Sequence, residues 1–190
     1  MFPNTLEQLI ADEESLDPLG DEFQQHNRYL NRCRRVTVGP SVVVVFENPR
    51  TLTLRLRELA RVAQLTHPDR VRREMNWYRT LLPGPGRLLA SVSVRGADRE
   101  LALALADGDV RLLAGSHAIP GTLRSDAAGD RIVGLVRWVE FEVNAEDRLA
   151  LADAQPLTVA VEVGSYSHES PPLSDAVRNS LLDDLAPARH

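Results

Sequence analysis

The stretch "RRVTVGPSVVVVFENPR" at residues 34–50 decides the fold, because it predicts a hairpin that leads directly into a helix. Valines alternate with other residues in its first half, and a continuous apolar run fills its second half. Gly39-Pro40 between the two halves is typical of a tight turn. We therefore predict two antiparallel strands, one over 34–38 and one over 42–46.

The segment after the hairpin is predicted to be helical. Asn48 followed by Pro49 fits an N-cap with proline at the first helical position. Leucines alternate with other residues from 52 to 56, as in a strand, but apolar residues also recur at helical spacing from 52 to 63. The cap and the length of the segment favour the helix.

The remaining hydrophobic patterns place helices first and strands mostly later, which predicts an α+β fold with N-terminal helices, the hairpin, and a mostly antiparallel or mixed sheet. Further helices are predicted near 5–11, 20–33, 98–106, 145–153 and 173–185. Another helix is predicted between a capping box formed by Thr66 and Asp69 and the proline–glycine stretch at 83–86. Further strands are predicted near 87–95, 110–114, 117–123, 134–143 and 157–163. A single domain over 1–190 is preferred, and a division into two subdomains at the proline–glycine stretch near 83–86 is the alternative.

The composition is that of an ordinary globular protein, with 190 residues, 43% hydrophobic and 26% charged. No apolar run reaches the roughly 20 residues that a membrane-spanning helix needs. The opening stretch "MFPNTLEQLIADEES" lacks the basic start and apolar centre of a signal peptide. Cys33 is the only cysteine, which excludes an intramolecular disulfide and a thiolate metal cluster. These features predict a cytoplasmic protein without membrane contact.

Charge is distributed unevenly along the chain, and all 22 basic side chains are arginine. Residues 1–27 have a net charge of −7, residues 28–79 of +8, and residues 80–190 of −6. The basic middle predicts binding of an anion or a partner protein, or else neutralisation by the acidic flanks on folding. Nucleic acid is the least favoured partner, because the pI is near 5.6 and no nucleic-acid motif accompanies the arginines. The arginines proposed for anion or partner binding are Arg34, Arg35, Arg57 and Arg61.

No glycine-rich phosphate loop, nucleophile elbow or H-E-x-x-H motif is present, so only loose groups of residues are candidates for chemistry. His26, Tyr29 and Cys33 share one face of the helix predicted near 20–33. A nearby histidine and arginines would lower the pKa of the thiol. An amphipathic helix with an incidental thiol explains the same spacing, and we predict that Cys33 is structural.

A second group lies on the two helices that follow the hairpin. Glu58 on one helix and Glu74 with Tyr78 on the next are placed to supply oxygen ligands to a metal ion between them. The preferred alternative is that both glutamates form ion pairs with nearby arginines, namely Arg55, Arg57, Arg61 and Arg73.

A third group lies in "EVGSYSHES" at 162–170, at the end of a predicted strand. Glu162, Tyr166 and His168 fall there, where loops often hold functional residues. A polar, solvated loop is the alternative.

The chain resembles a bacterial family known as domain of unknown function 3501, from about residue 5 to 185. The resemblance lies in "RRVTVGPSVVVVFEN", "RELAR", "EMNWYRTLLPGPGRLLASV", "VRWVEF" and the closing "LLDDL". The family implies no particular activity. Its members are often encoded beside rubrerythrin-like proteins and iron–sulfur proteins of the heterodisulfide-reductase type, which implies a redox or peroxide-stress setting and such a protein as the partner.

This chain departs from the family near its C-terminal strand. The family pattern of aspartate–histidine–proline shortly before a tyrosine corresponds here to Glu162, Val163 and Gly164 before Tyr166. The acid and the tyrosine persist, whereas the histidine and proline do not. If the family histidine is a ligand or a base, only His168 is near enough in the sequence to replace it, which indicates a divergent member.

Three functions remain open. The first is a non-catalytic accessory protein that binds a redox partner through its arginine-rich middle, and the second is a metal-dependent enzyme built on the carboxylate, tyrosine and histidine groups above. The third is a nucleic-acid binder. Metal analysis of the purified protein separates the second from the first, because only the enzyme requires a stoichiometric metal.

Glu47, at the end of the second hairpin strand, has two interpretations. A charge beside four valines is tolerated at the solvent end of a strand or where it is matched, so we expect Arg34 or Arg35 to pair with an acid, most simply Glu47. The alternative places Glu47 in a cavity with Glu58, Glu74 or Tyr166 as part of a catalytic site.

Overall fold

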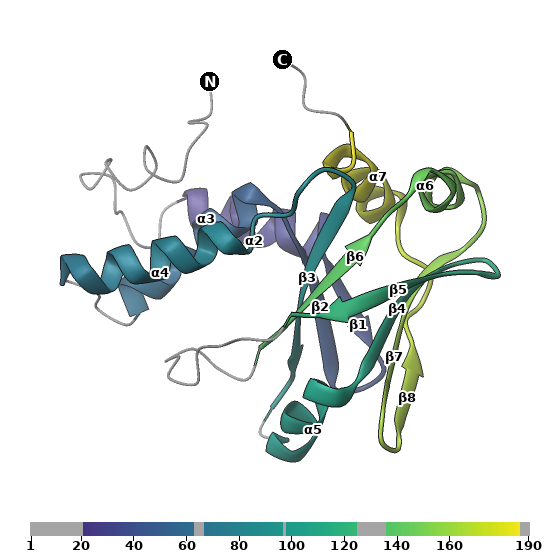
Figure 1. Cartoon of the computed structure of the whole chain (residues 1–190), viewed down its shortest axis with the longest axis horizontal. Helices are drawn as coiled ribbons and strands as arrows, with labels where there is room; N and C mark the ends of the chain where they lie inside the picture. Colours follow the sequence, from purple (N-terminus) through teal and green to yellow (C-terminus); the bar gives the residue numbers. More distant parts are fainter. Residues whose placement is uncertain (1–20, 63–66, 97, 125–135, 187–190) are drawn as a thin grey trace.

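The computed structural model describes residues 21–62, 67–96, 98–124 and 136–186 (Figure 1). The described helices are α2 (Asp21–Cys33), α3 (Pro49–Val62), α4 (Pro68–Thr80), α5 (Arg99–Ala104), the short 3-10 helix η2 (Leu105–Asp107), α6 (Ala145–Ala152) and α7 (Asp175–Asp184). The described strands are β1 (Arg35–Val38), β2 (Val42–Glu47), β3 (Arg87–Val94), β4 (Asp109–Ala114), β5 (His117–Leu123), β6 (Arg137–Glu142), β7 (Leu157–Val163) and β8 (Tyr166–Glu169). The predicted helix near 5–11 lies outside the described residues.

The eight strands form one sheet in the order β1-β2-β3-β6-β5-β4-β7-β8, and every neighbouring pair is antiparallel. The predicted α+β class is therefore confirmed, with an antiparallel sheet. Strands β2 and β3 lie on either side of residues 83–86 in the sequence, and every residue of β2 pairs with β3, from Val42 opposite Val94 to Glu47 opposite Leu89.

The hairpin predicted at the opening stretch is confirmed. Strand β1 pairs with β2 around Gly39, with Val38 opposite Val42. Asn48 begins the next helix as predicted: its side-chain oxygen accepts a hydrogen bond from the Thr51 backbone N–H at 3.0 Å. The Thr51 hydroxyl accepts one from the Asn48 backbone N–H at 2.8 Å. This local capping settles the ambiguous segment as helix α3.

Strand β2 is buried on both faces. Val42, Val44 and Phe46 face the main core inside the sheet. The alternating positions Val45 and Glu47 face the opposite side, where both contribute to a pocket with helices α2 and α3. The hairpin therefore places a charged residue beneath helices instead of in water.

A second, smaller core lies where the α3–α4 arm meets the sheet. Its buried members are Leu52, Leu56, Tyr78, Leu81, Leu89 and Trp138. The rings of Trp77 and Trp138 meet edge to face, 5.5 Å apart between centroids. This cluster fixes α3 and α4 against the outer face of β3 and β6. Figure 1 shows the two helices as an arm that extends from the sheet.

The sheet curls until its two ends meet. The Tyr166 hydroxyl on β8 donates to the Val38 carbonyl at 2.5 Å and accepts from the Val42 backbone N–H at 3.1 Å. Tyr166 lies in strand β8, where the sequence analysis expected a strand end and a loop. The difference arises at Gly164, whose φ of 56° allows a tight turn that returns the chain along β7.

Candidate functional site

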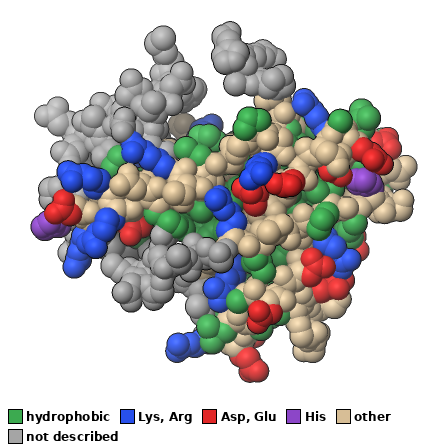
Figure 2. All heavy atoms as spheres, viewed as in Figure 1, with side chains coloured by type: hydrophobic (Ala, Val, Ile, Leu, Met, Phe, Trp, Pro, Cys, Tyr) green, Lys and Arg blue, Asp and Glu red, His purple; other side chains and the backbone are tan. Residues whose placement is uncertain are grey.

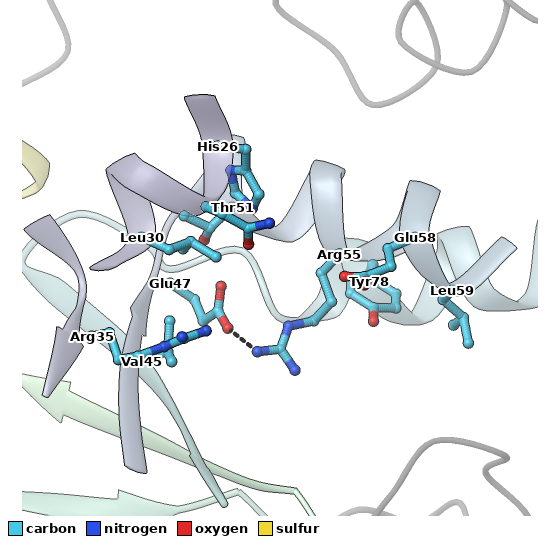
Figure 3. A pocket seen from close by; sticks show the side chains of 11 residues that line it. His26, Leu30, Arg35, Val45, Glu47, Thr51, Arg55, Glu58, Leu59 and Tyr78 are labelled. Atoms are coloured by element: carbon cyan, nitrogen blue, oxygen red, sulfur yellow. Dashed lines mark ion pairs between the residues drawn. The ribbon is translucent and has the colours of Figure 1, made fainter. Parts of the chain in front are cut away.

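A pocket of about 410 Å³ lies between helices α2 and α3 and the outer face of the hairpin (Figure 3). The described residues that line it come from the basic middle of the chain or its border, between 26 and 78. They are His26, Asn27, Leu30, Arg35, Val45, Glu47, Thr51, Arg55, Glu58, Leu59 and Tyr78. The volume is within the range of small-ligand sites, which begins at roughly 300 Å³.

The pocket contains a buried acid that is paired and hydrogen-bonded. The Glu47 side chain is 1% exposed, and its carboxylate lies 2.7 Å from the Arg55 guanidinium. The Ser91 hydroxyl donates to the same carboxylate at 2.8 Å and accepts from Arg55 at 2.9 Å. Arg55 also lies over the Trp138 ring, 5.3 Å from its centroid. The acid is therefore held in place by a closed set of contacts.

Helical phasing explains why α3 supplies several of these side chains. Because Asn48 begins the helix immediately after β2, residues 51, 55, 58 and 59 recur along one face. That face lies over the end of β2, where Glu47 is. Thr51 was missed in the sequence analysis, and Arg55 was considered there only as a neighbour of Glu58 and Glu74. The cap at Asn48 was the signal from which the orientation of both follows.

His26 on α2 is a second buried polar group of the pocket. It is 8% exposed, and its Nδ1 has no hydrogen-bond partner in the described structure. Burial lowers the pKa of His26 below its ordinary value, and the charges of Arg50, Arg55 and Arg35 lower it further, against the opposing charge of Glu47. The imidazole is therefore neutral at neutral pH.

Arg34 does not pair with Glu47, which corrects one expectation. Its side chain is 2% exposed and makes an ion pair with Asp184 on α7, with one contact at 3.1 Å. Its Nε donates to the Tyr29 hydroxyl at 2.8 Å. Arg34 lies in the turn between α2 and β1, and its guanidinium contacts α7 instead of the end of β2. The expected pairing of Arg34 with Glu47 was therefore wrong. The expectation that Arg34 pairs with an acid is confirmed.

Arg35 lines the pocket and is exposed. Its Nη1 donates a hydrogen bond to the Asn31 side-chain oxygen at 2.8 Å. Arg57 is half-buried on α3 and outside the lining. Arg61 belongs to α3, but its side chain is outside the described part of the structure. Of the proposed arginines whose side chains the structure describes, Arg35 lines the pocket, and Arg34 and Arg57 do not.

The metal-ligand group proposed from the sequence is only partly assembled. Glu58 is exposed and lines the pocket with the buried Tyr78, whereas Glu74 is half-buried and outside the lining. In the described ranges, no three histidine, cysteine, aspartate or glutamate side chains lie close enough together to hold a metal ion.

The C-terminal group takes part in the structure of the sheet and lies outside the pocket. Glu162 pairs with Arg111 on β4. Tyr166 is hydrogen-bonded to the β1–β2 turn, and its ring meets that of His168 edge to face at 4.4 Å. These residues do not face Glu47, so the proposed cavity combining Glu47 with Tyr166 is not formed.

The group His26, Tyr29 and Cys33 is divided by its contacts. His26 lines the pocket, and Tyr29 is hydrogen-bonded to Arg34. Cys33 is a half-buried free thiol outside the lining.

No described helix is long and apolar enough to cross a membrane.

The geometry defines an α+β protein built on one antiparallel sheet, with a charged pocket on its outer face. The chain belongs to a family of unknown function, DUF3501, which matches residues 19–185. Its fold is similar to that of a protein of unknown function from Burkholderia pseudomallei, with a TM-score of 0.70, 21% identity, and coverage of 96% of this chain and 95% of that one. At this identity the likeness shows the fold alone. No curated protein matches the chain.

Proposed function

We propose that this protein is a binding protein for a small polar molecule, which it holds in the pocket between α2, α3 and the hairpin. One observation supports this above the others: a buried, paired Glu47 and a buried His26 with an unpartnered nitrogen line the same pocket. Buried polar groups in proteins are nearly always hydrogen-bonded, so an exception in a pocket points to a ligand.

The lining has the mixture that small-ligand sites use. Apolar side chains from α2, β2 and α3 supply contact area, and a few fixed polar groups supply orientation. The Glu47 carboxylate has an ion pair with Arg55 and a hydrogen bond from Ser91 in the absence of a ligand. The pocket is therefore preorganised in the protein without ligand, which lowers the cost of binding.

A thermal-shift screen with a broad library of polar small molecules tests this proposal. A ligand at one hundred times its Kd stabilises a protein by about 2.7 kcal/mol, which is readily detected. Asn27→Phe fills the pocket from α2, and Gln25→Phe places the same bulk on an exposed position of that helix. We expect at least one compound to stabilise the wild type and Gln25→Phe but not Asn27→Phe. If no compound distinguishes the two variants, the proposal is wrong.

The accessory-protein hypothesis also has a specific observation in its favour. Exposed arginines lie along two helices of the N-terminal half, namely Arg28 and Arg32 on α2 and Arg70, Arg72, Arg73 and Arg79 on α4. Figure 2 shows basic side chains along the arm that contains α4. We propose an acidic surface of a rubrerythrin-like or iron–sulfur protein as the partner, on the strength of the family resemblance.

Salt dependence tests this second candidate. Binding of a purified rubrerythrin-like protein from the same genome is expected to weaken as ionic strength rises, because exposed charges are screened. The double variant Arg72→Glu with Arg73→Glu is expected to abolish it. If neither higher ionic strength nor the double variant weakens binding, the arginine surface of α4 is excluded as the contact.

A further inference from the structure

The exposed side of helix α2 is rich in arginine. Arg28 and Arg32 are both exposed and lie one turn apart on the helix. Because successive residues turn by about 100° around the helix axis, Tyr29 and Asn31 lie on either side of these two arginines. Each of the two flanking residues is contacted by an exposed arginine from another element.

These flanking contacts complete a basic surface. Arg35 of β1 donates to the Asn31 side-chain oxygen at 2.8 Å. The Arg50 guanidinium of α3 lies over the Tyr29 ring, 4.7 Å from its centroid. We call Arg28, Arg32, Arg35 and Arg50 the arginine face. Among the described residues, none of the four has a carboxylate partner, so that part of the chain leaves their charges uncompensated.

The segment that precedes α2 in the sequence has the opposite charge. Residues 1–20 contain five acids and no basic residue, the acids being Glu7, Asp12, Glu13, Glu14 and Asp17. This segment is joined directly to Asp21, where α2 begins. Arg32 lies only about 17 Å along the helix from Asp21, and an extended chain covers roughly 3.4 Å per residue. The acidic segment is therefore long enough to reach the whole arginine face.

We propose that the acidic segment 1–20 binds the arginine face of α2 in the same chain and excludes other acidic molecules from it. Exposed ion pairs are individually weak, so a free acidic peptide would bind such a face with a Kd of the order of millimolar. The direct link to α2 gives the segment an effective concentration of the same order. The face is therefore occupied for a large part of the time. This inference requires neither the pocket ligand nor the protein partner proposed above.

Paramagnetic NMR of the full-length protein tests the inference. A nitroxide is attached at Ala11→Cys in a Cys33→Ser background, and its broadening of the backbone amide signals around Arg28 and Arg32 is measured. We expect this broadening to fall at least about twofold from 0.01 M to 1 M salt, because the screening length falls from about 30 Å to about 3 Å. Broadening that does not depend on salt would mean that the link alone keeps the segment near α2, and the proposal would be wrong.

A triple variant of the segment is the matched control. Asp12→Asn with Glu13→Gln and Glu14→Gln keeps the link to α2 and removes three of the charges. We expect it to show at least about twofold less broadening at low salt, and to bind a fluorescent hexaglutamate peptide at least about twofold more tightly, because its arginine face is less occupied. Unchanged broadening would overturn the binding of the segment. Unchanged peptide affinity would overturn the exclusion of other acidic molecules.

Two double variants identify the surface. Arg28→Gln with Arg32→Gln is expected to reduce the broadening as the triple variant does. Arg72→Gln with Arg73→Gln removes the same charge from exposed positions on α4 and is expected to leave it unchanged. Equal effects of the two would overturn the assignment to α2. Broadening in a mixture of nitroxide-labelled protein and unlabelled ¹⁵N protein would show that the segment binds a second copy, which contradicts binding in the same chain.

Discussion

Glu47 ends strand β2 with its carboxylate buried, and its ion pair with Arg55 therefore affects stability as well as the pocket. Glu47→Gln removes the charge but keeps the shape of the side chain. Arg55 and Ser91 then contact a neutral amide that does not satisfy both of them. We expect the free energy of unfolding to fall by about 1–3 kcal/mol, as for a buried group left partly unpaired. Chemical denaturation measures the change.

Glu58→Gln is the matched control, because Glu58 lines the same pocket but is exposed and has no ion-pair partner among the described residues. Its effect on stability is expected to stay within about 0.5 kcal/mol. An unchanged stability of Glu47→Gln together with lost ligand binding would assign Glu47 to ligand contact, and the structural role would be wrong.

His26 predicts a pH dependence of stability. Its pKa is lowered in the folded protein by burial and by the neighbouring arginines, so the unfolded chain binds the proton more tightly. The contribution of His26 is therefore fully present above its unfolded pKa of about 6.5 and is lost as the pH falls from there toward the lower folded pKa. We expect denaturation curves between neutral and mildly acidic pH to show this loss in the wild type and a smaller one in His26→Gln. An identical pH profile for both proteins would contradict the assignment.

The sequence identified part of the pocket and missed the residues that complete it. Glu47, Glu58 and Tyr78 were candidates, and the structure places all three in the lining. Arg55 was considered only as a general neighbour of glutamates, because its specific partner depends on the phase of α3 relative to β2. Partners that come from separate elements cannot be assigned from spacing along the chain alone.

At the scale of elements, the contact between the β1–β2 turn and β8 brings the two ends of the sheet together. Gly39 has a φ of 59°, and a Cβ there would lie 2.5 Å from His168 Cγ and 2.7 Å from the Tyr166 hydroxyl oxygen. Gly39→Ala therefore introduces both backbone strain and overlap with β8. We expect a loss of about 1–2 kcal/mol from the backbone conformation and about 1–3 kcal/mol more from the overlap.

Gly164→Ala separates the two contributions. Gly164 has a φ of 56°, but a Cβ there would meet nothing within 4 Å. Equilibrium unfolding of both variants is expected to show the loss from strain alone at Gly164 and a larger loss at Gly39. Equal losses would mean that the turn moves away from β8 at no cost, and that the contact does not hold the sheet ends together.

Elements with a local signal were predicted well, and elements without one were not. Helix α3 was recovered because Asn48 and Pro49 mark its start, although its leucines also fit a strand. Strand β8 was missed because Tyr166–Glu169 is short and mostly polar, with three of its four residues exposed. Its pairing with β7 is defined by the turn at Gly164 and by the tyrosine contact, and neither has a hydrophobic pattern.

At the scale of the whole molecule, the uneven charges of the chain are partly matched by long-range pairs. Arg34 in the basic middle pairs with Asp184 near the C-terminus, 150 residues away in the sequence. Asn48 donates to the same Asp184 carboxylate at 3.1 Å. The Arg34 pKa is raised: burial alone would lower it, and the hydrogen bond and charge of Asp184 outweigh that effect. Neutralisation of the basic middle by the acidic flanks was one of the two interpretations of the sequence, but no local pattern identified Asp184 as a partner.

This pair joins α7 to the start of the sheet, so its loss is expected to affect the stability of the whole fold. Asp184→Ala leaves the Arg34 guanidinium buried without a counter-charge, and such a loss costs about 3–5 kcal/mol. Asp183→Ala changes the adjacent, exposed position of the same helix and is expected to cost less than about 0.5 kcal/mol. Denaturation followed by tryptophan fluorescence and by circular dichroism measures both.

The double variant Arg34→Met with Asp184→Leu distinguishes a buried charge from simple loss of packing. Replacing both partners removes the uncompensated charge, and buried ion pairs replaced by apolar residues of similar volume are often tolerated. We therefore expect the double variant to be more stable than Asp184→Ala, even though Tyr29 and Asn48 lose a partner in it. A double variant no more stable than the single one would show that the cost comes from packing at α7. In that case the ion pair would not be what attaches the last helix to the hairpin.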